Sequence, residues 1–167
     1  RGVNLYEALI QAVAATRSFL LNQPRDFYSN NFHPSHLPSL LAPAKPPPAA
    51  AFQPLTQALG LYGLVDDLAH LKRLLALGID SLQWRVKNPT ADYVATTQAA
   101  VEACRAAQVP LFINDDWQLA IQLNAYGVHL GQEDLATADL TAIQAAGLRL
   151  GISTHSDWEI ARAASLK

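Results

Sequence analysis

The stretch Leu111–Asp134, LFINDDWQLAIQLNAYGVHLGQED, shows one pattern twice. A short apolar run ends in polar residues, a helical pattern follows over Trp117–Leu123, and a second apolar run ends in polar residues again. Short polar side chains after the first run favour a helix start, because they accept hydrogen bonds from free backbone N–H groups. The carboxyl ends of parallel strands meet at one edge of a sheet, so we expect Asp115 and Asp134 to share one site.

The same alternation of strand and helix extends from Leu61 to the end of the sequence. It predicts five strands, over residues 61–65, 81–86, 111–113, 127–130 and 148–152. Regular alternation is typical of parallel strands joined by right-handed crossovers, either in an open doubly wound α/β sheet or in a (β/α)8 TIM barrel. No Gly-x-Gly-x-x-Gly motif follows the first strand, which disfavours a dinucleotide-binding sheet. Polar residues follow the strands, as at the catalytic face of a barrel, which would have five of its eight units here.

Capping and turn residues mark the helices between these strands. Asp66–Asp67 is expected to open a helix that Gly78 closes in the left-handed conformation. The next helix is predicted to bury one apolar face, formed by Val94, Thr97, Val101 and Cys104. A single helix is expected after Asp134, ending at Gly147, and Ser156 with Glu159 predicts a capping box for the last helix.

Composition restricts the classes of partner. Of the 167 residues, 50% are hydrophobic and 16% are charged, with a formal net charge of −2, which favours neither nucleic acid nor a membrane surface as partner. The one cysteine, Cys104, allows no disulfide within this sequence and favours a reducing, cytoplasmic location. Cys104 itself is expected in the core. No apolar run is long enough to cross a bilayer.

The first third of the sequence differs from the rest. Residues 1–21 contain an amphipathic helical pattern, and residues 22–58 lose periodicity and become rich in proline, which is typical of an extended linker. His33 and His36 lie three apart in that linker, but no other ligand type clusters there, so a solvated loop is favoured over a metal site. The predicted domains are therefore a helix over 1–21, a linker over 22–58 and a partial barrel over 59–167.

Three polar residues alternate along the second predicted strand. Gln83, Arg85 and Lys87 share one side of it, because successive side chains of a strand point to opposite faces. One interpretation is that this side is the solvent-exposed face of an edge strand. The other is an anion-binding site, because charged groups inside a sheet covered on both faces are costly without a partner.

Asp115 and Asp134 are a candidate Mg²⁺ pair, since Mg²⁺ prefers oxygen ligands and commonly takes one or two carboxylates plus substrate phosphates. The simpler roles are helix capping for Asp115 and a turn position for Asp134. Together with Arg85 and Lys87, the two acids describe a diphosphate site in which cations stabilise a leaving group. His129 lies within a strand and fits a buried or a functional histidine equally, and Ser153 fits a phosphate-binding residue better than a nucleophile.

Taken together, these motifs resemble those of the thiamine phosphate synthase family over residues 60–167. The matching segments, in chain order, are Leu61-Tyr62-x-Leu-Val-Asp66, Gln83-x-Arg85-x-Lys87, Asn114-Asp115, Gly127-Val128-His129-Leu130-Gly131-Gln132-x-Asp134 and Gly151-x-Ser153-Thr154-His155. The resemblance implies a (β/α)8 barrel and a transferase. Such an enzyme joins hydroxymethylpyrimidine diphosphate to thiazole phosphate and releases pyrophosphate.

The resemblance also implies a role for each matching residue. Asp115 and Asp134 would hold Mg²⁺, while Arg85, Lys87 and Asn114 would meet the diphosphate. Gln83 and its neighbours would bind the aminopyrimidine, and Ser153 would lie near the pyrophosphate. His129 would be a further substrate-binding residue. The implied mechanism is dissociative: pyrophosphate leaves first and the thiazole nitrogen then attacks a methylene cation. Arg85, Lys87 and Ser153 are the residues implied in catalysis.

The family's thiazole-phosphate loops are expected beyond Lys167, so this sequence is expected to be inactive as it stands and to be a fragment of a complete enzyme. Gly2–Leu21 resembles the final helix of hydroxymethylpyrimidine (phosphate) kinase, which implies a fused kinase domain. Two rival functions are a thiazole tautomerase-like or regulatory paralogue and a non-catalytic phosphate-binding module. The presence of Arg85, Lys87, Asp115 and Asp134 favours the synthase.

Overall fold

The structure is a computed structural model that describes residues 51–164 and 166. Residues 51–153 lie in one compact unit, and residues 154–164 and 166 lie in another, so each unit is described by itself. The helix predicted over residues 1–21 and the linker residues before 51 lie outside the described residues.

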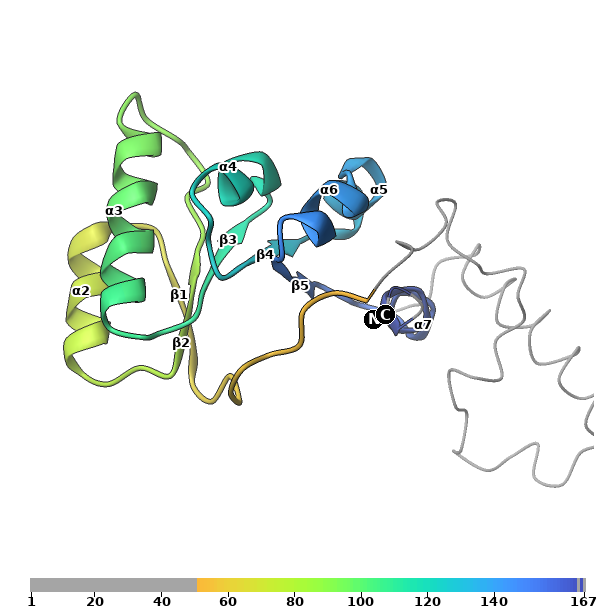
Figure 1. Ribbon diagram of the computed structural model, residues 1–167, viewed down its shortest axis with the longest axis horizontal. Coiled ribbons are helices and arrows are strands. Elements are labelled where there is room, and N and C mark those ends of the chain that lie inside the picture. Colours follow the sequence, from red (N-terminus) through yellow and green to blue (C-terminus); the bar gives the residue numbers. More distant parts are fainter. Residues whose placement is uncertain (1–50, 165, 167) are drawn as a thin grey trace, which may run out of the picture. The chain divides into compact units, whose positions relative to one another are not determined.

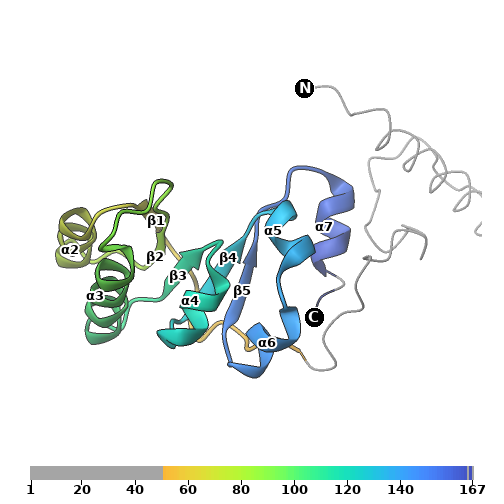
Figure 2. The same ribbon diagram turned by 90° about the horizontal axis from the view of Figure 1, so that it is seen from above.

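The first unit is built on a parallel sheet of five strands in the order β1-β2-β3-β4-β5. The strands are β1 (Tyr62–Val65), β2 (Ser81–Trp84), β3 (Leu111–Asn114), β4 (Gly127–Leu130) and β5 (Arg149–Ile152). Figure 2 shows them following one another in chain order, and every neighbouring pair is parallel. The predicted alternation and the parallel arrangement are confirmed. The order without a reversal is that of a barrel wall, which is not closed here, rather than of a doubly wound sheet.

Helices connect the strands and cover one face of the sheet. They are α2 (Leu68–Ala76), α3 (Tyr93–Ala106), α4 (Trp117–Gln122), α5 (Gln132–Thr137) and α6 (Leu140–Ala145). The second unit contains the helix α7 (Asp157–Ala164). Figure 1 shows α2 and α3 side by side. Asp67 caps α2 by accepting from the His70 N–H, and Gly78, at φ +77°, follows its end in the left-handed conformation, as expected.

Successive side chains of each strand point alternately to the face that the helices cover, here called the helix face, and to the opposite face, here called the inner face. Trp84 belongs to the helix face, because its indole N–H donates to the Thr97 hydroxyl of α3 at 3.0 Å. Gln83 therefore points to the inner face, where it meets Tyr62 of β1. The helix face contains the apolar core, formed by Leu71, Leu82, Trp84, Val101, Ile113, Val128, Leu130 and Ile143 among others.

Two glycines make room for rings on the inner face. A Cβ at Gly127 would lie 2.6 Å from the Phe112 ring, and one at Gly151 would lie 2.6 Å from the His129 Nδ1. These distances are shorter than any tolerable carbon contact, so both positions require glycine while the rings stay in place. The rings of Phe112 and His129 therefore fill the space that side chains at positions 127 and 151 would otherwise take.

Residues 51–61, here called the entry segment, lie at the amino-terminal end of the sheet. Arg149 Nε donates to the Pro54 carbonyl at 3.0 Å, and the Thr56 N–H donates to the Tyr126 hydroxyl at 3.0 Å. The Asp80 carboxylate accepts from the Leu61 N–H at 2.7 Å. The entry segment is thus bonded to β5, to the residue before β4 and to the residue before β2.

Several details differ from the sequence-based predictions. Strand β2 ends at Trp84, not at residue 86, so Lys87 lies in the loop after the strand. The single helix expected before Gly147 is two helices, because Asp139 starts α6 by accepting from the Ala142 N–H at 3.0 Å. Val94 is 50% exposed rather than part of the buried face of α3.

The prediction for Cys104 is confirmed, since its side chain is 1% exposed. In the described part of the chain, no helix combines the length and the apolar character needed to cross a membrane.

Candidate functional site at the carboxyl ends of the strands

Two acidic side chains meet at the carboxyl end of the sheet. Asp115 follows β3 directly, and Asp134 lies in the first turn of α5, just after β4. Burial, the negative charge of Asp134 and a hydrogen bond between the two carboxyl groups raise the pKa of Asp115 above its ordinary value. The structure therefore places the two carboxyl groups beside each other, as expected for residues that share one site.

The backbone around Asp115 fixes its position. Asp115 has φ +63°, a left-handed conformation that is uncommon for a residue with a side chain. Its N–H donates to the His129 carbonyl at 2.9 Å, which ties it to the end of β4. The Asn114 amide and the Gly131 N–H donate to its carboxylate. Helix capping at this turn is done by Asp116, which accepts from the Leu119 N–H at 3.0 Å, so Asp115 is left for another role.

Two cations follow β2 on the same edge of the sheet. Arg85 and Lys87 are exposed and line a cleft of about 490 Å³ together with Asp66, His70 and Asn88. Within residues 51–164 and 166, no carboxylate lies within ion-pair distance of either cation. Positive groups that share a cleft without a protein counter-ion can receive an anion.

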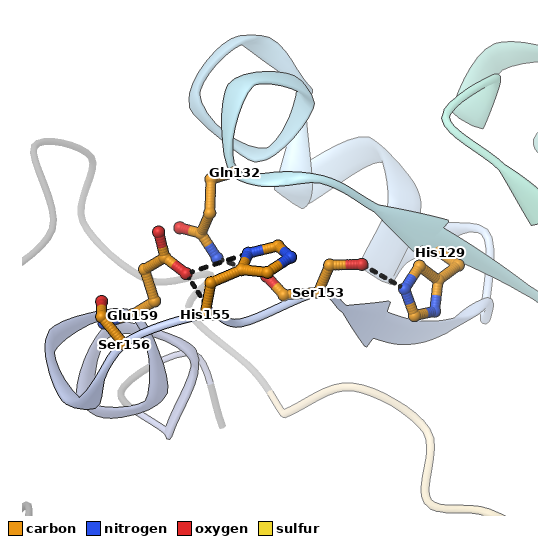
Figure 3. Close-up of polar contacts among 6 residues, drawn as sticks. All are labelled: His129, Gln132, Ser153, His155, Ser156 and Glu159. Atoms are coloured by element: carbon orange, nitrogen blue, oxygen red, sulfur yellow. Dashed lines mark hydrogen bonds and ion pairs between the residues drawn. The ribbon is translucent and has the colours of Figure 1, made fainter. Parts of the chain in front are cut away.

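A histidine and a serine form a hydrogen bond at the ends of β4 and β5. The Ser153 hydroxyl lies 2.8 Å from His129 Nε2, and Figure 3 shows it turned toward the ring. The Gln132 amide donates to the Ser153 carbonyl at 2.7 Å and holds that residue from α5. No carboxylate in the described chain bonds to the His129 ring, so the third member of a nucleophilic triad is missing there.

The surroundings of His129 disfavour its charged form. Burial and the nearby charge of Arg85 lower the pKa of its imidazole below the ordinary value. A neutral imidazole can accept from the Ser153 hydroxyl or donate to it. The electrostatic effect of Arg85 also links the cation cleft to the His129–Ser153 pair.

Gln83 lies deeper on the inner face than the cations. Its side chain is 3% exposed, and its amide Nε2 donates to the Tyr62 hydroxyl at 3.2 Å. The Tyr62 ring meets Phe112 edge-on at 5.9 Å and lies 6.5 Å from the His129 ring. Tyr62 was not among the sequence-based candidates. No local signal in the sequence marks it, because its contact with Gln83 depends on the pairing of β1 with β2.

The structure brings the predicted residues together in three groups. Asn114, Asp115 and Asp134 form one, Arg85 and Lys87 a second, and His129 with Ser153 a third, while Gln83 lies apart from all three with Tyr62. Among the described residues no set of three or more His, Cys, Asp or Glu side chains is arranged to hold a metal ion. The group of Asn114, Asp115 and Asp134 contains two carboxylates, which is fewer than such a set requires.

The second unit contains a separate polar cluster. The Glu159 carboxylate accepts from the His155 N–H and lies 3.4 Å from its Nδ1, and the Ser156 hydroxyl accepts from the Glu159 N–H at 3.3 Å (Figure 3). Ser156 and Glu159 thus cap the start of α7, as the capping-box prediction expects, with His155 as the backbone donor to Glu159.

Comparison with known proteins gives consistent matches. Residues 61–167 match the thiamine monophosphate synthase family. The chain is 56% identical over 119 residues to a thiamine-phosphate synthase of Yersinia pseudotuberculosis, covering 70% of this chain and 54% of that protein. It is 54% identical over 121 residues to the thiamine-phosphate synthase of Photorhabdus laumondii, covering 72% of this chain and 56% of the relative. The chain thus spans about half the length of the curated relatives it matches.

A solved structure is similar in fold. The thiamine phosphate pyrophosphorylase of Pyrococcus furiosus superposes with a TM-score of 0.56 at 24% identity, over 64% of this chain and 56% of that one. The open sheet of five parallel strands therefore corresponds to part of a TIM-barrel-like α/β fold. Because the family match covers most of the sequence, including every strand and every group of the site, the chain belongs to the thiamine monophosphate synthase family.

Proposed function

We propose that the full-length protein is a thiamine-phosphate synthase, a transferase of thiamine biosynthesis. It joins hydroxymethylpyrimidine diphosphate to thiazole phosphate and yields thiamine phosphate and pyrophosphate. The observation that carries this proposal is that the paired carboxyl groups of Asp115 and Asp134 and the exposed cations Arg85 and Lys87 all follow the carboxyl ends of strands in one parallel sheet. The names of the relatives support it, since both are called thiamine-phosphate synthase.

The acidic group fits a Mg²⁺ ion. Asp115 and Asp134 are forced together closely enough to raise the pKa of Asp115, and a divalent cation would relieve that repulsion. Carboxylate oxygens are the hard ligands that Mg²⁺ prefers, and a site with two of them leaves room for water and phosphate oxygens. Asp115 and Asp134 would hold the ion, which would supply positive charge to the diphosphate.

Arg85 and Lys87 bind and neutralise the same diphosphate in this proposal. Both side chains are exposed in the cleft and lack a carboxylate partner within the described residues, so their charge is available to a ligand. Fixed cations stabilise a leaving group more as its negative charge grows, which is the condition for catalysis rather than mere binding. Asn114 sits beside Asp115 and can offer its amide to the same phosphates.

His129 and Ser153 position substrate rather than attack it. The Ser153 hydroxyl is bonded to the His129 imidazole, and in the tautomer whose Nε2–H donates to it, the hydroxyl can itself donate to a phosphate oxygen. The buried amide of Gln83, which precedes Arg85 by two residues in the chain, contacts the aminopyrimidine ring. None of these groups forms a covalent bond to substrate, so the chemistry rests on positioning and charge.

The test is product formation by the full-length protein. Hydroxymethylpyrimidine diphosphate, thiazole phosphate and Mg²⁺ are supplied, and thiamine phosphate is followed by oxidation to a fluorescent thiochrome. We expect product that requires Mg²⁺ and is lost in Asp134→Asn with the fold preserved. A folded full-length protein that makes no product would contradict the synthase and favour the tautomerase-like paralogue.

The cytoplasmic location, the kinase fusion and the domain limits at residues 21 and 58 stay predictions. The hydrogen bonds of the entry segment support one refinement, which is that the barrel unit takes in residues 51–58 as well as the strands.

A further inference from the structure

The carboxamide of Gln83 is buried with half of its hydrogen-bonding capacity in use. The side chain is 3% exposed, and its Nε2 donates to the Tyr62 hydroxyl at 3.2 Å. Its carbonyl oxygen has no hydrogen-bond partner among residues 51–164 and 166. A buried amide oxygen without a donor is costly, so a native site that keeps one is expected to fill it with a ligand.

Tyr62 is held so that it can fix that amide. Its ring packs edge-on against Phe112 and beside His129, which limits its rotation. Burial raises the pKa of Tyr62 above 10.0, so the phenol keeps its proton over the physiological range. The phenol oxygen accepts from Gln83 and the phenol proton remains available to a second acceptor.

We propose that Tyr62 is a positioning residue that fixes the orientation of the Gln83 carboxamide and so makes the site select a 4-aminopyrimidine over a 4-oxopyrimidine. The proposal rests on the proposed function, since it assigns how the pyrimidine diphosphate is recognised. Tyr62 acts through Gln83 and belongs to β1, whereas the residue that it orients belongs to β2.

The orientation matters because an amide can be turned either way. The terminal torsion of glutamine is broad and roughly two-fold, so an unrestrained carboxamide offers either its oxygen or its N–H to a ligand. With Nε2 committed to Tyr62, the Gln83 carbonyl oxygen is the group left to meet the ligand, and it can only accept. A 4-aminopyrimidine presents an amino donor to that oxygen. A 4-oxopyrimidine presents a carbonyl oxygen there, which cannot donate.

The experiment measures binding by calorimetry with the full-length protein, Mg²⁺ and no thiazole phosphate. The two ligands are hydroxymethylpyrimidine diphosphate and its 4-oxo analogue. The native protein is expected to bind the amino form at least about tenfold more tightly, the loss expected when a buried polar group is left unpaired. In Tyr62→Phe the carboxamide can turn, so the preference is expected to fall to about threefold or less.

Two further variants separate positioning from general damage. Tyr126→Phe also removes one hydroxyl, the one that bonds to Thr56 at the amino-terminal end, and it is expected to keep the native preference. Gln83→Leu removes the amide that Tyr62 orients. If Tyr62 acts through Gln83, Tyr62→Phe changes neither affinity in the Gln83→Leu background, and the two substitutions are not additive.

Each outcome decides the matter. Equal preference in the native protein and in Tyr62→Phe, or additive effects with Gln83→Leu, overturns the proposal. If Tyr62→Phe does not fold, the native protein still decides, because equal affinity for the amino and oxo ligands contradicts a fixed acceptor. Failure of the proposed function is distinguishable, since a protein that selects the amino ligand yet makes no thiamine phosphate loses the synthase activity alone.

Discussion

The polar groups at the two ends of the sheet have different partners. At the amino-terminal end, Arg149 stacks on Tyr126 at 4.1 Å and donates to Pro54, and Asp80 accepts from Leu61, so each charge is used within the protein. At the carboxyl end, Arg85 and Lys87 have no carboxylate partner in the described chain. The two ends share one scaffold, so the difference indicates which end is arranged for structure and which for a ligand.

The strongest test of this comparison is the removal of a carboxyl-end cation. Arg85→Ala is expected to lower kcat/KM for thiamine phosphate formation by on the order of 100-fold or more, because a fixed charge on the leaving group is lost. Its thermal midpoint is expected to stay near the native value, since no protein bond is broken. Activity by the thiochrome assay and unfolding by circular dichroism measure the two effects.

The matched change at the other end is Arg149→Ala. It removes a cation–π contact and the hydrogen bond to Pro54, so the free energy of unfolding is expected to fall by about 1–3 kcal/mol. The KM for each substrate is expected to remain native at a temperature where the variant is folded. A large activity loss in a folded Arg149→Ala would break the division between the two ends.

A smaller effect on stability is expected at a residue with left-handed backbone conformation that lies away from the candidate site. Gln108, at φ +57°, follows the end of α3 at the amino-terminal end of the sheet, a position that usually holds glycine. Gln108→Gly is expected to raise the free energy of unfolding by about 0.5 kcal/mol, measured by urea titration, because strain relief slightly exceeds the added freedom of the unfolded chain. A clear loss of stability would mean that the Gln108 side chain has a role of its own.

The smallest expected effect concerns Asp115, whose pKa is raised in the fold. A raised carboxyl pKa favours folding only while the group is protonated, so its cost appears as pH rises from the ordinary aspartate range through the folded pKa. Without Mg²⁺ at pH 7, Asp115→Asn is expected to be more stable than the native protein by less than about 1 kcal/mol. The gain should vanish at pH 3, where the Asp115 carboxyl is protonated in both the folded and the unfolded protein.

Magnesium should reverse the order of those two proteins. Added Mg²⁺ is expected to raise the thermal midpoint of the native protein, through preferential binding to the folded state, and to leave Asp115→Asn unchanged. Equal shifts in both proteins would argue that the ion binds elsewhere.

Much of the fold follows from the sequence, because each strand–helix unit has its own local signals. Asp67, Gly78 and Ser156 mark helix ends through bonds to residues a few positions away, and the structure has them as predicted. The break between α5 and α6 was missed because the apolar spacing continues across it, although Asp139 is the residue type that starts a helix. Local patterns alone do not decide whether Asp139 starts a new helix or lies inside one continuous amphipathic helix.

The candidate site was predictable in part for the same reason. The pairing of Asp115 with Asp134 follows from parallel strand ends. The expected alternation of Gln83 with Arg85 stays a prediction, because β2 ends at Trp84. The Tyr62–Gln83 bond did not follow, because it depends on which strands are neighbours and on their register, 21 residues apart in the chain. Roles toward a ligand stay predictions until binding is measured.

The register of β2 has a consequence for the size of the ligand. Gln83 lies in β2, and Arg85 directly follows its last residue with its N–H still bonded to the Val65 carbonyl at 2.7 Å. Two residue rises of extended chain would separate their Cα atoms by roughly 6.6 Å. The spacing of these two residues therefore sets the distance between the amide that would bind the ring and the cation that would bind a phosphate. A ligand with one more methylene between ring and diphosphate could not reach both groups at once, whatever its charge.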